Sequence, residues 1–351
     1  MSDSAYARAG VDTSRADSAI HGLVDVLRTI DTGKPSRSVL RSGHYAAVID
    51  LNGIGLALST DGVGTKVIVA EQLGRYDTVG IDCVAMNVND LVCVGAEPIA
   101  LLDYIAVEDA DPEVLRQIGV GLKEGAEQAG VEIPGGELAQ LPELIRGHPS
   151  PRGFDLAASS FGVVALDAVL TGDAIQPGDA VIGLASNGLH SNGYTLARRA
   201  LPDLGEELGS ATVGDELLRP TAIYVRAALE LLRADGIDVH GLAHITGDGF
   251  LNLPRLSGSV GWSIDSPLPV PPLCELIAER ASVPPEDMWE TFNMGCGFCC
   301  VVPAAQAPAA TELLGRHHEA KVIGSVTAEA GLVELPFAGL AGRRGEGFRR
   351  A

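Results

Sequence analysis

Lysine, aromatic residues and long apolar runs are all scarce in this chain of 351 residues. Lysine occurs only as Lys34, Lys66, Lys123 and Lys321, and aromatic residues make up 4% of the sequence. With 25 basic and 46 acidic residues, the formal net charge is -21. A chain this acidic repels nucleic acid and anionic membranes, so we expect neither as a partner. Any bound nucleotide would need a metal ion, helix N-termini or a few placed cations.

No apolar run reaches the roughly 18 residues that a membrane-spanning helix needs. The opening segment MSDSAYARAGVDTSRADS is polar and lacks the apolar region of a secretory signal. We therefore expect a cytoplasmic protein whose cysteines stay reduced. Cys296, Cys299 and Cys300 lie in the run CGFCC, and its CxxC spacing could also serve zinc binding or redox chemistry. A second ligand pair at a suitable spacing is missing, which favours buried thiols.

Length and patterning predict two domains of the α/β (α+β) class. Hydrophobic residues make up 46% of the sequence and charged residues 20%, a balance typical of globular proteins. A chain of 351 residues is too long for one ordinary core. We expect an irregular N-terminal arm over 1–36, a first domain over 37–167, a second domain over 168–335 and a flexible tail over 336–351.

Apolar patterns separated by Gly, Pro and Asp predict alternating strands and helices in both domains. Before residue 168 we predict strands over 39–50, 53–62, 99–107 and 154–166, with helices over 78–94 and 112–129. After the turn-rich segment TGDAIQPGDA, we predict strands near 180–185, 240–245, 259–264, 296–302 and 320–326. Such alternation is typical of layered α/β architectures.

The run STDGVGTK is the strongest local signal for function. An apolar strand ends at Asp61, and the following glycines let the backbone approach a ligand closely. Asp61 could hold Mg²⁺ and Lys66 could neutralise phosphate charge, although the glycine spacing differs from the Walker pattern. A tight turn with a solvated lysine is the alternative interpretation.

Two further runs offer carboxylates. In IDCVAMNVNDLV, Asp82 and Asn89 are seven residues apart and share a helix face, with Asp90 beside them. Buried carboxylates need a partner, and a metal is a natural one, although an exposed helix face is the alternative. In IPGGELAQLPE, a predicted strand ends in a glycine turn that presents Glu137, either as a ligand or as ordinary turn chemistry.

Three runs in the second half are also rich in Gly, Asn and Thr. In ASNGLHSNGYTLAR, Ser191 or Asn192 could cap a helix, and His190 could donate to a phosphate. HITGDGF repeats the strand, glycine turn and helix pattern, and TFNMGCGF places Asn293 before two glycines. Together the six runs suit polyphosphate and Mg²⁺ binding, and hence phosphoryl transfer, in which positioning and charge stabilisation dominate.

In this order, these runs resemble the phosphoribosylformylglycinamidine cyclo-ligase family, also called aminoimidazole ribonucleotide synthetases. The resemblance adds AYARAGVD, YDTVG and the LDYIA strand, and it extends from about residue 5 to about residue 330. It implies a homodimer whose N-terminal sheets form a β-barrel-like core flanked by helices, with a C-terminal α/β domain. It also implies ATP and Mg²⁺ as cofactors and a ribonucleotide substrate whose formamide oxygen is phosphorylated before the amidine nitrogen closes an imidazole ring.

The resemblance assigns roles to residues of this chain. Catalytic roles fall to Asp61, Lys66 and His190, and metal binding to Asp61, Asp90 and Glu137. The ATP contacts it implies are Gly43, His44, Asp61, Gly62, Gly64, Thr65, Lys66, Asp82, Asn89 and Asp90. The substrate contacts it implies are His190, Ser191, Asn192, Gly193, Thr246, Gly247, Gly249 and Asn293.

This chain departs from the family pattern at Leu138, Gln140 and Asp248, where the family usually has Thr, Glu and Gly. The loop before the first strand also has fewer glycines. A related ATP-dependent enzyme, such as a thiamine-monophosphate kinase, is one alternative. An inactive nucleotide-binding paralogue that serves as a partner is another, although Asp61, Lys66 and Asp90 are retained.

Overall fold

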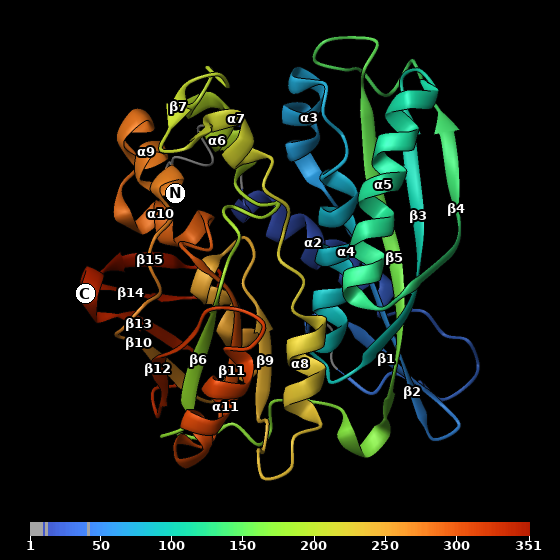
Figure 1. The fold of residues 1–351 in the computed structure, drawn as a ribbon. Helices are drawn as coiled ribbons and strands as arrows, with labels where there is room; N and C mark the ends of the chain where they lie inside the picture. The colour runs from blue at the N-terminus through green and yellow to red at the C-terminus, as the bar shows by residue number, and fades with distance from the viewer. Residues whose placement is uncertain (1–9, 11–12, 41–42) are drawn as a thin grey trace.

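Two α/β domains lie side by side, each built on its own sheet (Figure 1). The computed structural model describes residues 10, 13–40 and 43–351. The N-terminal sheet has five strands and the C-terminal sheet has eight. Helix α4 of the first domain and helix α8 of the second lie between the two sheets (Figure 1). The predicted two-domain α/β class is confirmed.

The N-terminal sheet is antiparallel except at one edge, where β3 and β4 run parallel. Its strands in spatial order are β1 (Ala47–Leu51), β2 (Ile54–Gly62), β5 (Phe154–Ala165), β3 (Glu97–Val107) and β4 (Glu132–Gln140). Its helices are α3 (Val67–Leu73), α4 (Val79–Val92) and α5 (Pro112–Ala129). The predicted helices over 78–94 and 112–129 and the strands over 53–62, 99–107 and 154–166 are confirmed within two residues at each end.

Burial along β5 separates the two faces of this sheet. Leu156, Ala158 and Ser160 are buried toward α4, whereas Asp155 and Ser159, on the alternate positions, are exposed. We call the exposed side the outer face. Helix α4 is buried on nearly all sides, including every residue from Val79 to Asn89. A helix buried on all sides is a core element, so α4 packs against this sheet on one side and toward the second domain on the other.

The C-terminal sheet joins the five predicted strands to β13, which was not predicted, and to two strands from the tail. In spatial order the strands are β15 (Gly347–Arg350), β14 (Leu340–Arg343), β13 (Leu332–Leu335), β10 (Gly261–Ile264), β12 (Ala320–Thr327), β6 (Ala180–Ala185), β11 (Cys296–Val302) and β9 (Gly241–His244). The helices around it are α6 (Tyr194–Ala200), α7 (Val213–Leu217), α8 (Val225–Leu232), α9 (Pro272–Ala281), α10 (Pro285–Thr291) and α11 (Ala307–Leu314). A small hairpin pairs β7 (Glu207–Leu208) with β8 (Ala211–Thr212).

Four local expectations were wrong. The strand predicted over 39–50 forms only as β1, which begins at Ala47. The tail is not frayed, because β14 and β15 pair in antiparallel register and bury Leu340 and Phe348 against the domain. The arm is not wholly irregular, because α2 spans Thr13–Leu27. The apolar residues in the second half of α2 recur at helical spacing, which explains that helix. The Pro-Gly-Gly stretch before Glu137 continues β4 instead of ending it, and proline is tolerated there because β4 is an edge strand.

Among the described residues, no helix has both the length and the apolar character that crossing a bilayer would require.

Close packing between α4 and α5 provides a stability test. A Cβ at Gly80 of α4 would collide with the backbone of Leu122 on α5. We expect Gly80→Ala to lower the free energy of unfolding by about 1–3 kcal/mol, the usual cost of overpacking. Gly119→Ala on α5 is the matched control, because a Cβ there meets no atom of the described residues within 4 Å. It should raise stability by about 0.5–1 kcal/mol. Urea unfolding followed by circular dichroism would show equal effects if the helices do not pack this closely.

Candidate functional site

Two carboxylates of the N-terminal domain, those of Asp61 and Asp90, lie near each other where the two domains meet. Asp61 is at the end of β2, and Asp90 is on the last turns of α4. The Asn87 side chain on α4 accepts from the Asp61 N–H and donates to the Asp61 carbonyl, both at 3.1 Å. These two hydrogen bonds fix the strand end against the helix, so backbone contacts hold the two carboxylates in place.

The surroundings of Asp61 favour a bound cation. Burial raises the pKa of Asp61, and the nearby negative charge of Asp90 raises it further. The Gly62 N–H, which donates to Asp61 Oδ1 at 2.7 Å, opposes this shift, as do His244 and Arg255. A cation between two partly buried carboxylates relieves both desolvation and repulsion. The structure thus brings together the two aspartates that the sequence suggested as metal ligands.

A histidine of the C-terminal domain orients Asp90. His244, at the end of β9, is fully buried, and its Nδ1 lies 2.9 Å from Asp90 Oδ1. Its Nε2 lies 3.5 Å from the Asn89 side-chain amide, which can only donate there. These contacts place a proton on Nδ1, which donates it to Asp90. Sequence analysis had assigned no role to His244, although it directly precedes the ITGDG turn.

The segment at Gly43 and His44 reaches the same junction. Burial, followed by the charge of Arg255, lowers the pKa of His44 to about 4, so the ring is neutral near pH 7. His44 Nδ1 accepts from the Tyr45 N–H at 3.0 Å, which leaves the proton on Nε2. The Nε2 atom is buried and has no hydrogen-bond partner among the described residues. This donor is therefore available to a ligand.

Lys66 is enclosed in the contact between the two domains, which does not support the direct phosphate contact that the sequence suggested. Its side chain is fully buried, and its ammonium lies 2.9 Å and 2.8 Å from the two carboxylate oxygens of Asp82. The same ammonium donates to the carbonyls of His190 at 3.2 Å and Arg219 at 2.6 Å. Burial lowers the pKa of Lys66, and the Asp82 charge opposes the shift. All three N–H groups of the ammonium donate hydrogen bonds within the protein, so the buried Lys66 side chain fixes the turn that precedes it.

Asp82 is likewise occupied by the protein. Its Oδ1 accepts from the Thr221 N–H at 2.7 Å, the Thr221 hydroxyl at 2.6 Å and the Ser191 hydroxyl at 3.3 Å. Thr221 and Ser191 belong to the C-terminal domain. Asp82 therefore joins the domains and does not contact nucleotide directly in this geometry.

His190 is also internal, and its Nδ1 is buried without a hydrogen-bond partner among the described residues, so its donation to a phosphate stays a prediction. Only 1% of it is exposed, and its Nε2 accepts from the Asn187 N–H at 3.0 Å. Burial lowers the pKa of His190 well below its ordinary value, so the ring is neutral. Its φ of 62° places it in the left-handed region, which is a strained position for a residue with a side chain. Its role here is to shape the loop around it.

Two asparagines that were predicted as ligand contacts are buried and hydrogen-bonded within the protein. Asn89 donates to the Ala222 carbonyl and accepts from the Tyr224 N–H, both at 2.9 Å, which ties α4 to the chain before α8. Asn293 accepts from the Ser186 hydroxyl at 3.0 Å and donates to the Gly188 carbonyl at 2.9 Å. Both side chains are at most 3% exposed. They position backbone around the site and present no free group to it.

Two turns, one from each domain, meet at the HSNGY segment. The Thr65 hydroxyl lies 3.3 Å from that of Thr195, and a Cβ at Gly64 would lie 3.9 Å from the Ser191 carbonyl oxygen. In the turn formed by Thr246, Gly247, Asp248 and Gly249, a Cβ at Gly247 would lie 3.4 Å from Asn192 Oδ1. The predicted ATP contacts Gly64 and Thr65 are therefore close in space to the predicted substrate residues of the C-terminal domain.

The start of α6 differs from the predicted capping. The N-cap is Gly193, with a φ of 78°, and no side chain of the described residues caps the helix. A Cβ at Gly193 would collide with the ring of Phe292. Ser191 bonds Asp82 instead, and Asn192 has a buried Nδ2 without a partner within the described chain.

Glu137 lies away from the aspartate pair. It is exposed on β4 in the row Gly62, Ala157, Tyr104, Glu137, which is on the outer face. Asp61 belongs to the next row, which places Ala158 and then Asp103 beside it on the helix-covered face. Burial raises the pKa of Asp103, and its carboxylate lies over Gly136, where a Cβ would collide with it. Asp103 was missed, although an acid inside the apolar run IALLDYIAV was a usable signal.

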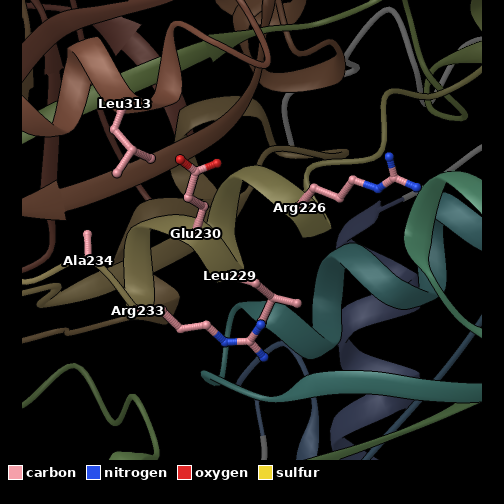
Figure 2. A pocket seen from close by; sticks show the side chains of 6 residues that line it. All are labelled: Arg226, Leu229, Glu230, Arg233, Ala234 and Leu313. Carbon is pink, nitrogen blue, oxygen red and sulfur yellow. The ribbon is translucent and has the colours of Figure 1, made fainter.

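A separate hollow of about 490 Å³ is lined by residues of α8 and the chain after it and by Leu313 of α11 (Figure 2). Its lining residues are Arg226, Leu229, Glu230, Arg233, Ala234 and Leu313. The charged groups there already have partners: Arg233 pairs with Glu97 at 2.6 Å, and Arg226 donates to the Glu127 carbonyl at 2.6 Å. This hollow contains no predicted site residue, and its arginines tie α8 to the N-terminal domain.

The buried Lys66–Asp82 pair predicts a stability effect. Lys66→Met leaves the Asp82 carboxylate buried without its cation, which should cost about 3–5 kcal/mol of unfolding free energy. Asp82→Asn should cost a similar amount. The double variant should cost clearly less than the sum, because neither charge then remains unpaired. Denaturant unfolding measures all three values. Strict additivity would mean that the two side chains do not interact as described.

Two family models match the chain. One is described as AIR synthase related protein, N-terminal domain, and covers residues 43–164; its C-terminal counterpart covers 176–334. Among solved structures, hydrogenase maturation protein HypE in complex with ATP has a TM-score of 0.62 at 24% identity, covering 87% of this chain and 86% of that one. AaThiL complexed with AMPPCP and TMP has a TM-score of 0.62 at 18% identity, covering 90% and 93%. At these identities the likeness shows a shared fold.

Relatives of known name are much closer in sequence. The phosphoribosylformylglycinamidine cyclo-ligase of Thermococcus kodakarensis is 48% identical over 336 residues, which is 93% of this chain and 96% of the relative. A protein of the same name from Methanothermobacter thermautotrophicus is 48% identical over 94% of this chain and 96% of its own length. The resemblance seen in the motifs is therefore confirmed: the chain belongs to the AIR synthase related family.

Proposed function

We propose that the chain catalyses the ATP-dependent closure of formylglycinamidine ribonucleotide to aminoimidazole ribonucleotide in de novo purine biosynthesis. The observation that carries the proposal is the Asp61–Asp90 carboxylate pair at the junction of the two domains. Relatives with 48% identity over nearly the whole chain bear the name of this cyclo-ligase. We place the reaction in the cytoplasm, where the six free, buried cysteines would stay reduced.

Asp61 and Asp90 fit a magnesium ion that is held jointly with nucleotide phosphates. Carboxylate oxygens are the ligands that Mg²⁺ prefers, and one or two of them usually suffice when phosphates and water complete the shell. Within residues 13–40 and 43–351, no group of three His, Cys, Asp or Glu side chains forms a ready metal site. When bound, Mg²⁺ would neutralise charge on the transferring phosphate. His244 would hold Asp90 in place from the opposite domain.

The proposed reaction has two steps. First, the formamide oxygen of the substrate attacks the γ-phosphorus of ATP, and ADP leaves. The amidine nitrogen then attacks the activated carbon, the carbon–oxygen bond breaks, phosphate leaves with the former formamide oxygen, and the nitrogen loses a proton. The substrate supplies both nucleophiles, so the chain needs none. Its groups hold the reactants in register and exclude water from the phosphorylated intermediate.

Three groups of residues would carry these tasks. On the nucleotide side lie His44 Nε2, the backbone of the turn from Gly62 to Thr65, and the two aspartates. On the substrate side lie the turn over 246–249 and the Asn192 amide, whose buried Nδ2 lacks a partner in the described chain. The backbone of both the nucleotide side and the substrate side is held in place by three buried residues, Lys66, Asp82 and His190. We therefore assign these three to positioning.

We also propose that the enzyme is a homodimer joined through the outer face of the N-terminal sheet. Ile54, Leu102, Tyr104 and Val163 lie on that face, each more than a third exposed. An uncovered sheet face with such apolar residues favours burial against a second copy. Glu137 is on the same face, so its carboxylate would lie at or near the contact.

Asp61→Asn should reduce turnover about 100-fold or more while the fold remains intact, because the amide keeps the acceptor for Gly62 but loses the charge. The measurement is ADP release that depends on the amidine ribonucleotide at saturating Mg²⁺, with circular dichroism for folding. Asp167→Asn, an exposed aspartate beyond β5, is the control and should match wild type. Unchanged turnover in Asp61→Asn would remove this residue from the site. Wild-type protein that releases no ADP with this substrate would refute the proposed function.

Light scattering at micromolar concentration should give twice the chain mass of 36.3 kDa. Leu102→Asp should shift the protein toward monomer, because it would bury a charge in the proposed interface. Val120→Asp is the matched control, since Val120 is similarly exposed but lies on α5. Dissociation by both variants or by neither would contradict an interface on the outer face.

A further inference from the structure

We infer that Arg255 and Asn252 form a clamp between the domains that couples the proposed substrate turn to the proposed nucleotide segment. The substrate turn is 246–249, and the nucleotide segment is 43–45. Both clamp residues lie in the helical turn Gly249–Arg255 that follows the substrate turn. The inference rests on the proposed function for the identity of the two ligands. The clamp itself rests on contacts between described residues.

Asn252 fixes the backbone of the substrate turn. Only 1% of it is exposed, and its Nδ2 donates to the Gly247 carbonyl at 2.7 Å and to the Gly249 carbonyl at 2.9 Å. Its Oδ1 accepts from Arg255 Nη1 at 3.4 Å. The Asn252 side chain therefore contacts the backbone of the turn through Nδ2 and the Arg255 guanidinium through Oδ1. A shift of the turn would displace Asn252 and, through it, Arg255.

Arg255 reaches across the domain boundary to the nucleotide segment. Its Nε donates to the Gly43 carbonyl at 3.3 Å, and its Nη2 donates to the His44 carbonyl at 3.0 Å. The guanidinium carbon lies 4.0 Å from the centre of the Tyr45 ring, which is a cation–π contact. Tyr45 connects the nucleotide segment back to the other clamp residue, because its hydroxyl donates to the Asn252 carbonyl at 3.3 Å.

These contacts matter because the nucleotide segment has little support of its own. Strand β1 begins only at Ala47, so 43–45 has no sheet partner. Gly43 has a φ of 106°, a conformation that glycine adopts most easily. Side chains of the other domain therefore decide where His44 and its unpartnered Nε2 lie. When substrate orders the turn, the clamp orders the segment in advance, and nucleotide then binds at a smaller entropic cost.

Such coupling is reciprocal and measurable. Binding of a nonhydrolysable ATP analogue with Mg²⁺ is titrated with and without a saturating amount of the amidine ribonucleotide. In wild type we expect the substrate to tighten analogue binding by about 5-fold or more, which is at the lower end of typical coupling. Arg255→Gln should bring that factor close to one. Arg255→Lys should restore it only in part, because a single ammonium cannot bridge both carbonyls in a fixed fork.

Arg280→Gln is the matched control. Arg280 lies on α9 in the same domain, and its guanidinium pairs with Glu206 at 2.6 Å on the surface. This variant should keep the wild-type coupling factor, so a general effect of losing an arginine is separated from the clamp. An unchanged coupling factor in Arg255→Gln would overturn the inference, and so would equal losses in both variants.

Hydrogen exchange keeps the clamp testable if the proposed function fails. In protein without ligands, amides of the peptide over 43–50 should exchange at least about 5-fold faster in Arg255→Gln than in wild type or Arg280→Gln. That result needs neither ATP nor the amidine ribonucleotide. Equal exchange in all three proteins would refute the clamp even if wild type turns over. Faster exchange in Arg255→Gln without turnover in wild type would refute the proposed substrate and support the clamp.

Discussion

The buried ion pair between Lys66 and Asp82 is the contact on which the junction of the two domains depends. Both residues belong to the N-terminal domain, yet their remaining hydrogen bonds go to the carbonyls of His190 and Arg219 and to Thr221. A buried pair of this kind is costly to break, because either charge alone would remain desolvated. The domains therefore meet in one defined arrangement. This arrangement fixes the positions of the aspartate pair and of the two turns.

Helix α4 transmits that constraint to the site. From its first turn to its last, its polar side chains hold a different partner each: Asp82 holds Lys66, Asn87 holds the end of β2, Asn89 holds the chain before α8, and Asp90 meets His244. A helix with so many buried polar groups tolerates little rotation or sliding, because each shift would leave several groups unsatisfied. The geometry around Asp61 is thus set by the helix behind it as much as by its own strand.

Sequence patterns were sufficient for the architecture and for the general place of the site. Helical and strand periodicity located α4, α5 and β5 closely, because these elements are long and regular. The prediction failed at α2 and β15, where polar or Gly- and Arg-rich composition suggested irregular chain. For the site, local motifs could not show which polar groups satisfy one another. Lys66 was read as a phosphate ligand because its partner Asp82 lies 16 residues away in another element.

Two of the residues that sequence analysis missed, His244 and Arg255, have their contacts in the other domain. His244 matters through Asp90, and Arg255 matters through the carbonyls of Gly43 and His44. No spacing rule connects positions that are 154 and more than 200 residues apart. Glu137 shows the reverse case, a motif carboxylate that the single chain places on the outer face.

Charge explains why the missed arginine is important in a chain with a net charge of -21. Lys66 brings a positive charge close to the site, but Asp82 neutralises it at 2.8 Å. Arg255 donates to neutral carbonyls and makes no ion pair with any residue that the structure describes. Its charge is therefore not neutralised by a contacting carboxylate of the described residues, and it opposes the rise in the pKa of Asp61. An anionic nucleotide entering beside two carboxylates would meet this uncompensated cation, so Arg255 would contribute attraction as well as position.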